Sequence, residues 1–213
     1  MHPLPGRNVG TSIVAAWNEL RSAVRKYTLS VSNNYQPQAL DFHLCRFDLS
    51  SARGRANGCV VNARLITPSA LPRIPAGDPQ VICKVVDFLR YPDDARSLAG
   101  EAHTYAVLRV LQGKVIPTLY GYYDVWGILR FLALQFVGNA IPDGVQIDQR
   151  LCDKMKAVLR HIHRAGFVHG DIARRNFCGM AGGTVFLVDL ERCRRHGGNL
   201  SAMEDEMNEI DIL

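Results

Sequence analysis

Apolar side chains near the N-terminus recur at the spacing of one helix face. The steps between them are 4, 3, 4 and 3 residues, and the positions are Ile13, Trp17, Leu20, Val24 and Tyr27. Residues 28–37 are polar and include a Ser-Asn-Asn run, which is typical of a linker. We therefore predict an amphipathic helix and a linker over residues 1–37, with the helix packed on the chain's own core or on a partner.

Short apolar runs bounded by turn residues follow from about residue 38, and such runs predict strands. A hairpin turn is indicated at Trp126-Gly127, and a helix is predicted over residues 95–111, after Pro92. The five predicted strands cover residues 40–47, 59–66, 81–88, 120–125 and 128–137. Residues 38–137 therefore carry five strands and one helix.

Residues 138–213 begin with a helical pattern instead. Apolar positions between Ile147 and Ile162 lie on one helix face, and Gly166 follows as a glycine often follows a helix. Two short apolar runs around Gly182-Gly183 predict a hairpin, and Ser201 to Glu204 fits the capping box that opens a last helix. The fold class expected from the whole pattern is α+β.

Composition excludes several classes of protein. The chain has 213 residues, of which 47% are hydrophobic and 21% charged, so neither a disordered nor a fibrous protein is expected. The net charge of +5 is mild, and the arginines are not interleaved with aromatic residues, so nucleic acid is not an expected partner. None of the six cysteines forms a Cys-x-x-Cys pair, which argues against structural zinc.

Localisation is predicted from the absence of long apolar runs. Every such run is far shorter than the roughly 18 residues that span a bilayer, so no membrane association is expected. Residues 1–10 lack the apolar segment of a signal peptide. These observations predict an intracellular chain, cytoplasmic or nuclear.

Three polar residues in the second half have a spacing that suggests chemistry. A two-residue turn at Gly182-Gly183 would pair positions whose numbers sum to 365, which sets Asn176 opposite Asp189. Asp171 lies on the loop that leads into this hairpin. Carboxylate and amide oxygens suit Mg²⁺ held together with substrate phosphates. The alternative is that all three residues only cap turns, which Asp and Asn favour.

The run from His169 to Asn176, His-Gly-Asp-Ile-Ala-Arg-Arg-Asn, and the later Val-Asp189-Leu resemble the catalytic loop and magnesium motif of the protein-kinase-like superfamily. His-Gly-Asp in place of His-Arg-Asp is similar to atypical branches such as aminoglycoside phosphotransferases and the small kinase of the KEOPS complex. The chain also resembles small fungal kinase-like proteins. The resemblance implies that Asp171 is catalytic and that Asn176 and Asp189 bind magnesium.

A two-lobed kinase-like fold follows from this resemblance. Residues 38–137 would form the first lobe, a five-stranded antiparallel sheet with one helix, and residues 138–213 a truncated, mainly helical second lobe. The implied ligands are ATP and Mg²⁺. In the same alignment Asp211, on the last helix, would brace the backbone of the catalytic loop.

The nucleotide site is also implied by the resemblance. Lys84, in Val-Ile-Cys-Lys, would hold the α- and β-phosphates and pair with Glu101 in the first helix. The alternatives are a solvated lysine at a sheet edge and a glutamate that faces water. Gln135 and Val137 would form the hinge that binds adenine through backbone groups.

The glycine-rich loop of the family is only partly matched. Gly54, Gly58 and Val60 keep part of the pattern that cradles phosphates with backbone amides, and a simple hairpin turn fits equally well. Asp189-Leu190-Glu191 stands in place of Asp-Phe-Gly. Gly170 replaces the arginine that reads a phosphorylated activation loop, so that mode of control is expected to be absent.

The function expected from the resemblance is transfer of the γ-phosphoryl group of ATP to a hydroxyl acceptor. A protein Ser or Thr is the broad family expectation, and a small-molecule acceptor is an alternative. A second alternative is a catalytically inactive kinase-like module that binds nucleotide or a partner, supported by the partial glycine loop and the Asp-Leu-Glu motif. A third is that the chain is a fragment of a longer protein.

Overall fold

The structure, a computed structural model, describes residues 37–39, 45–54, 58–65, 80–179 and 183–213. All of them belong to one compact unit, Ser32–Leu213. The predicted N-terminal helix and most of the predicted linker lie outside the described residues. None of the described helices is both long enough and apolar enough to cross a membrane.

The larger sheet has six strands rather than the five predicted. In sheet order they are β1 (Gln38–Ala39), β5 (Leu119–Val125), β6 (Leu129–Gln135), β4 (Val81–Asp87), β3 (Gly58–Leu65) and β2 (Cys45–Gly54). The four pairings from β5 to β2 are antiparallel, and the additional strand, β1, pairs in parallel with β5. A two-residue strand has no alternation of its own, so the hydrophobic pattern could not indicate it.

The first predicted strand differs from the observed one, and the predicted β5–β6 turn agrees with the structure. The strand expected at residues 40–47 is β2, which runs from Cys45 to Gly54 and includes polar residues that the apolar pattern excluded. Its pairing with β3 shifts between Asp48 and Arg53, so an irregularity interrupts the ladder. The hairpin of β5 and β6 does turn at Trp126 and Gly127, both of which have positive φ.

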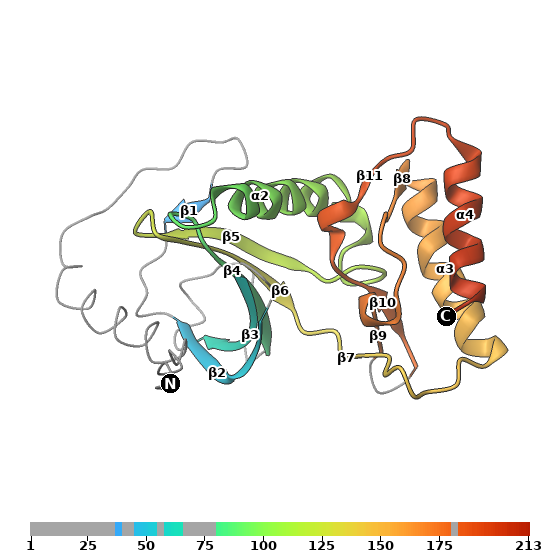
Figure 1. The fold of residues 1–213 in the computed structure, drawn as a ribbon, viewed down its shortest axis with the longest axis horizontal. Coiled ribbons are helices and arrows are strands. Elements are labelled where there is room, and N and C mark those ends of the chain that lie inside the picture. The colour runs from blue at the N-terminus through green and yellow to red at the C-terminus, as the bar shows by residue number, and fades with distance from the viewer. Residues whose placement is uncertain (1–36, 40–44, 55–57, 66–79, 180–182) are drawn as a thin grey trace, which may run out of the picture. The chain divides into compact units, whose positions relative to one another are not determined.

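Helix α2 (Pro92–Val107) lies along the sheet, and a 3-10 turn, η3 (Arg109–Leu111), follows it (Figure 1). Pro92 opens the helix and Asp93 and Asp94 lie in its first turn, where a fixed φ and negative charge are favourable. The buried face contains Ala95, Leu98, Ala102 and Tyr105. Glu101 lies on this same face and is 1% exposed, so an ionisable group points into the core.

The second half contains two more helices and two small antiparallel sheets. The helices are α3 (Gln149–Arg164) and α4 (Leu200–Asp211). The sheets are β10 (Val185–Leu187), β9 (Phe177–Gly179) and β7 (Asn139–Ala140), and β11 (Arg194–Arg195) with β8 (Phe167–Val168). Two 3-10 turns complete it, η4 (Arg174–Asn176) and η5 (Leu190–Arg192). The α+β class is therefore confirmed.

The end of α3 agrees with the prediction, whereas the start of α4 does not. Helix α3 begins after Asp148, whose side chain accepts a hydrogen bond from the Leu151 amide, and it ends just before Gly166, where φ is +89°. Helix α4 begins earlier than the Ser201 capping box predicts. The side chain of Asn199 caps it by accepting from the Ala202 amide, and asparagine is as effective a cap as serine.

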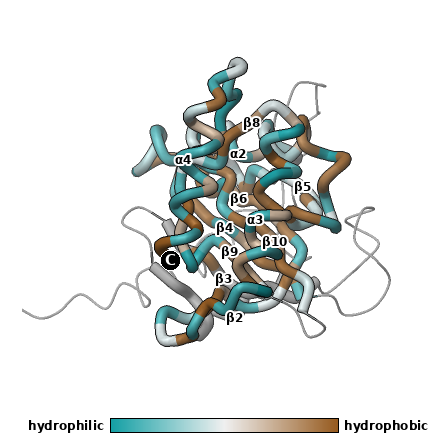
Figure 2. The backbone as a smooth tube through the Cα atoms, turned by 90° about the vertical axis from the view of Figure 1, so that its right-hand side faces the viewer, coloured by the Kyte–Doolittle hydropathy of each residue, from teal (hydrophilic) through white to brown (hydrophobic). Residues whose placement is uncertain are grey.

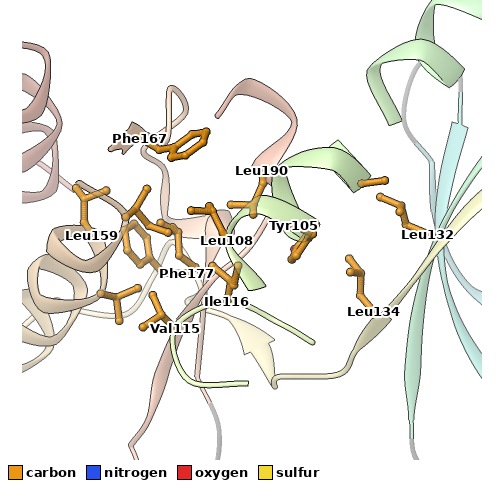
Figure 3. Close-up of a cluster of buried hydrophobic side chains, with 14 of the residues drawn as sticks. Tyr105, Leu108, Val115, Ile116, Leu132, Leu134, Leu159, Phe167, Phe177 and Leu190 are labelled. Carbon is orange, nitrogen blue, oxygen red and sulfur yellow. The ribbon is translucent and has the colours of Figure 1, made fainter. Parts of the chain in front are cut away.

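One hydrophobic core connects these elements. Figure 3 shows side chains from α2, β6, α3, β8 and η5 in the same cluster, among them Tyr105, Leu132, Leu159, Phe167 and Leu190. Along the tube in Figure 2 hydrophilic and hydrophobic stretches alternate, as expected where each helix buries only one face. The Leu187 amide also donates to the Val115 carbonyl at 2.8 Å, so β10 is bonded to the segment that follows η3.

Candidate functional site

A buried ion pair joins β4 to α2. The ammonium of Lys84, which is 8% exposed, lies 2.6 and 2.7 Å from the two carboxylate oxygens of Glu101. A lysine and a glutamate so deep in the protein remain charged only when they compensate each other. The predicted pairing of Lys84 with Glu101 is therefore present, and the alternative of two solvated side chains is wrong.

Asp189 joins the same charge cluster from the other half of the chain. Its Oδ1 lies 2.8 Å from the Lys84 ammonium, and the next amide, that of Leu190, donates to Glu101 at 3.1 Å. Asp189 has φ of +67°, a left-handed conformation that is uncommon for aspartate and costs of order 1 kcal/mol or more. Lys84, Glu101 and Asp189 thus come together from β4, α2 and the segment between β10 and η5.

The register of the β9–β10 hairpin differs by one residue from the prediction. Leu187 pairs with Phe177 and Val185 with Gly179, so paired numbers sum to 364 rather than 365. Asn176 is consequently opposite Val188, whose amide donates to the Asn176 carbonyl at 2.9 Å. The prediction that Asn176 pairs with Asp189 is wrong because the connection is not the two-residue turn that was assumed.

Asn176 instead holds Asp171. Its side-chain nitrogen donates to the Asp171 carbonyl at 2.8 Å and to the Asp171 carboxylate at 3.0 Å. Asn176 is only 2% exposed, whereas the Asp171 side chain keeps 22% of its surface exposed. Both bonds use the amide nitrogen, and the amide oxygen of Asn176 accepts no hydrogen bond from another described residue.

The loop that carries Asp171, here called the Asp171 loop (residues 169–173), needs a glycine before the aspartate. Gly170 has φ of +79°, and a Cβ there would lie 2.6 Å from the carbonyl oxygen of Arg192. Any other residue at this position would be strained and would push the backbone of η5 aside. The glycine of His-Gly-Asp is therefore a structural requirement of this chain.

His169 fastens the Asp171 loop to the hairpin. Its side chain is fully buried, and Nε2 lies 3.0 Å from the Val188 carbonyl. Burial lowers the pKa of His169, although the Val188 carbonyl and nearby carboxylates oppose the shift. The ring is therefore neutral and donates from Nε2, while its buried Nδ1 has no hydrogen-bond partner among the described residues.

Glu206 of α4 binds the same loop, a role that the sequence prediction gave to Asp211. Its carboxylate accepts from the backbone amides of Gly170 at 2.6 Å and His169 at 3.1 Å, and it lies 2.8 Å from Nε2 of His163. Burial alone would raise the pKa of Glu206, but these hydrogen bonds outweigh burial and leave the pKa lowered. Asp211 instead pairs with Lys156 on α3.

The spacing of α4 contained a signal for Glu206. Glu206 lies four residues before Ile210 and three after Met203, so it belongs to the apolar stripe that packs on the protein. A glutamate within such a stripe is 6% exposed here and needs a buried partner. That position, rather than the acidic composition of the helix, identifies Glu206 as the residue that binds the Asp171 loop.

The predicted hinge follows β6. The Gln135 side chain accepts from the Thr118 amide and hydroxyl at 3.2 and 2.9 Å, which fixes this end of the strand. Val137 is buried against Cys178 and Phe186. Its amide donates to no other described residue, whereas the intervening Phe136 amide donates to Gln80.

The glycine positions are described only in part. Gly54 ends β2 and Gly58 begins β3, and residues 55–57 between them lie outside the described part of the chain. Val60 is the register partner of Lys84 across β3 and β4. The structure therefore brings Val60 beside Lys84.

The chain matches no model of a known protein family and no curated protein. A function is therefore inferred from the contacts of the site residues.

Two further observations bear on ligands. Among the described residues no three His, Cys, Asp or Glu side chains are grouped as a metal site would require, so a metal here would depend on Asp189, the Asn176 amide and oxygens from a substrate. A pocket of ≈ 590 Å³ lies between α3, α4 and the segment before α4. Arg160, His196 and Met203 line it, and none of the predicted site residues does.

Proposed function

We propose that this chain is an ATP- and Mg²⁺-dependent phosphotransferase with a two-lobed, protein-kinase-like fold. It transfers the γ-phosphoryl group to a hydroxyl, and the acceptor is a Ser or Thr of a protein. The observation that carries the proposal is the contact of one buried lysine, Lys84, with both Glu101 and Asp189. The cluster holds one positive and two negative groups, so it suits a polyanion that arrives with Mg²⁺, and buried ion pairs by themselves are weak stabilisers.

Lys84 positions the phosphates in this proposal. An ammonium has three N–H donors, and here they meet two oxygens of Glu101 and one of Asp189. The Glu101 contact fixes the direction of the lysine, and the donor now on Asp189 is the one available for a phosphate oxygen. Asp189 and the Asn176 amide oxygen would hold Mg²⁺, which would neutralise charge on the transferred phosphoryl group.

Asp171 accepts the proton of the acceptor hydroxyl. Its partly exposed carboxylate is oriented by the Asn176 amide, and the two loop residues before it are held by Glu206 and by the contact of the His169 ring with Val188. Phosphoryl transfer depends mainly on positioning and on charge stabilisation, so a carboxylate fixed from several sides fits this role.

The remaining contacts to ATP are assigned to backbone groups. The Val137 amide and the Gln135 carbonyl bind the adenine, and the amides near Gly54 and Gly58 contact the phosphates. Val60, beside Lys84, covers the nucleotide. The Val137 amide supports this assignment, because it donates to no other described residue and a hinge needs a donor for the adenine.

A second candidate is a kinase-like module that binds nucleotide or a partner without turnover. The ion pairs of Lys84 with both carboxylates and of Asp171 with Arg175 favour it, since every charged group at the site already has a partner within the protein. A small-molecule phosphotransferase is a variant of the first proposal and differs from it only in the acceptor.

Asp171→Ala tests the catalytic proposal. Loss of a general base slows a reaction about 10²-fold or more, so transfer from radiolabelled Mg-ATP to dephosphorylated casein, and to water, should fall by that factor. Asp153→Ala, an exposed aspartate of α3, is the matched control and should transfer at the wild-type rate. Activity of Asp171→Ala within a few-fold of wild type would contradict the assignment, and Mg-ATP binding without any transfer would favour the non-catalytic module.

A further inference from the structure

An arginine forms an ion pair with the carboxylate of Asp171. One terminal nitrogen of Arg175, Nη2, lies 2.8 Å from both Asp171 oxygens. The Arg175 side chain is 66% exposed, three times the exposed fraction of Asp171. A ligand bound at Asp171 would therefore lie next to an exposed guanidinium.

Most of the guanidinium remains available to a ligand. Only Nη2 is used by Asp171, and Asp171 is the one partner of Arg175 within the part of the chain that the structure describes. The other N–H groups form a planar fork that matches a carboxylate or phosphate. A neighbouring anion could bind that fork while the contact with Asp171 persists.

A second arginine adds positive charge to the same loop. Nη1 of Arg194 lies 2.9 Å from the position that a Cβ would take at Gly170, directly before Asp171. Arg194 is exposed and makes no ion pair with any described residue. Its charge acts on an approaching anion because a Debye length is about 10 Å at 0.1 M salt.

Glu209 opposes this field. Burial raises the pKa of its carboxyl, and the neighbouring carboxylates of Glu206, Asp205 and Asp171 raise it further. The direct contact of Arg175 with Asp171 does not depend on this field.

We propose that Arg175 selects an acceptor whose reactive hydroxyl lies next to an anionic group, and specifically a Ser or Thr beside an acidic residue. The inference rests on the phosphotransferase function proposed above. The hydroxyl donates to Asp171 and the neighbouring anion binds Arg175, so the acceptor offers the carboxylate a hydrogen-bond donor and the guanidinium an anion. A neutral or basic acceptor would leave Arg175 without that compensation.

The transfer step itself is unchanged by this selection. The acceptor oxygen forms a bond to the γ-phosphorus, and the bond between that phosphorus and the β–γ bridging oxygen breaks. The electron pair leaves with ADP, and the acceptor proton passes to Asp171. Arg175 contacts the anionic group beside the hydroxyl and takes no part in the bonds that form and break.

Three matched peptides test the inference. Each carries one Ser, flanked by Glu, by Ala or by Lys, and glycerate serves as a small hydroxy acid. The charge-assisted contact predicts that wild-type kcat/KM is about 10- to 100-fold higher for the acidic peptide than for the Ala peptide. Arg175→Gln should bring that ratio close to one, and Arg175→Lys should restore part of it.

Arg96→Gln is the control. Arg96 is an exposed arginine of α2 that also pairs with an aspartate at 2.8 Å, and its loss should leave the ratio unchanged. A wild-type enzyme with no preference for the acidic peptide, or an acidic preference that survives Arg175→Gln, would overturn the inference while the phosphotransferase function stands. Use of glycerate in place of every peptide would reassign the anion to a small molecule. Failure to bind Mg-ATP would overturn the proposed function and this inference together.

Discussion

Lys84 is the residue on which the charge cluster depends. It is nearly buried, and its two partners come from positions 17 and 105 residues away in the chain. Taking such charges out of water costs several kcal/mol per ion, which close opposite charges offset only in good geometry. Each member of the cluster therefore keeps the other two in place.

Glu101→Gln tests that dependence. The variant leaves Lys84 with one carboxylate instead of two, so we expect the free energy of unfolding to fall by roughly 1–3 kcal/mol. The lysine also loses its fixed direction, so the affinity for Mg-ATP should fall. Urea unfolding and nucleotide titration measure the two effects.

Glu204→Gln, at an exposed glutamate of α4, is the control for Glu101→Gln and should change neither quantity. If Glu101→Gln keeps both the wild-type free energy of unfolding and the wild-type affinity for Mg-ATP, then Lys84, Glu101 and Asp189 do not depend on one another.

Helix α4 holds the Asp171 loop in place through one buried side chain. Glu206 accepts from two consecutive loop amides, and His163 of α3 binds the same carboxylate. Two helices and the loop thus meet at one buried group. Cys152 and Lys156 of α3 add a second link between the helices through Asp211.

The lowered pKa of Glu206 predicts how stability varies with pH. A carboxyl whose pKa is lower in the folded state contributes stability that is present above its ordinary pKa, near 4.5, and is lost as the pH falls through the folded value. We expect the wild-type free energy of unfolding to decrease more steeply than that of Glu206→Gln between about pH 5 and about pH 3.

Urea unfolding across this range measures the difference. Asp211→Asn leaves the contacts of Glu206 in place, so its activity at neutral pH should exceed that of Glu206→Gln. Parallel pH profiles for the wild type and Glu206→Gln would contradict the role of this carboxylate.

At the scale of the whole molecule, the periodic elements were predicted well. Helix α3 has a long apolar stripe and a terminal glycine, and the β5–β6 hairpin has a turn with two positive φ angles, so local spacing determined both. The pairing of Lys84 with Glu101 was also predicted, from the resemblance to kinases and from the need of a buried lysine for a counter-charge.

The features that the sequence did not indicate depend on distant contacts. The parallel pairing of β1 involves two residues and leaves no pattern. The register of β9 and β10 depends on the length of their connection, which the paired glycines suggested but did not determine. The place of Glu206 in the apolar stripe of α4 indicated burial, but its partners are backbone amides 36 and 37 residues away, which the stripe does not identify.

Thermal unfolding of the chain with and without Mg-ATP tests the proposal that these residues form an Mg-ATP site. Ligand at 100 times Kd stabilises a protein by about 2.7 kcal/mol, which for a chain of this size raises Tm by roughly 5–10 °C. We predict this rise for the wild type and its loss in Asp189→Asn. A cooperative transition that saturating Mg-ATP leaves at the same temperature would contradict the proposal.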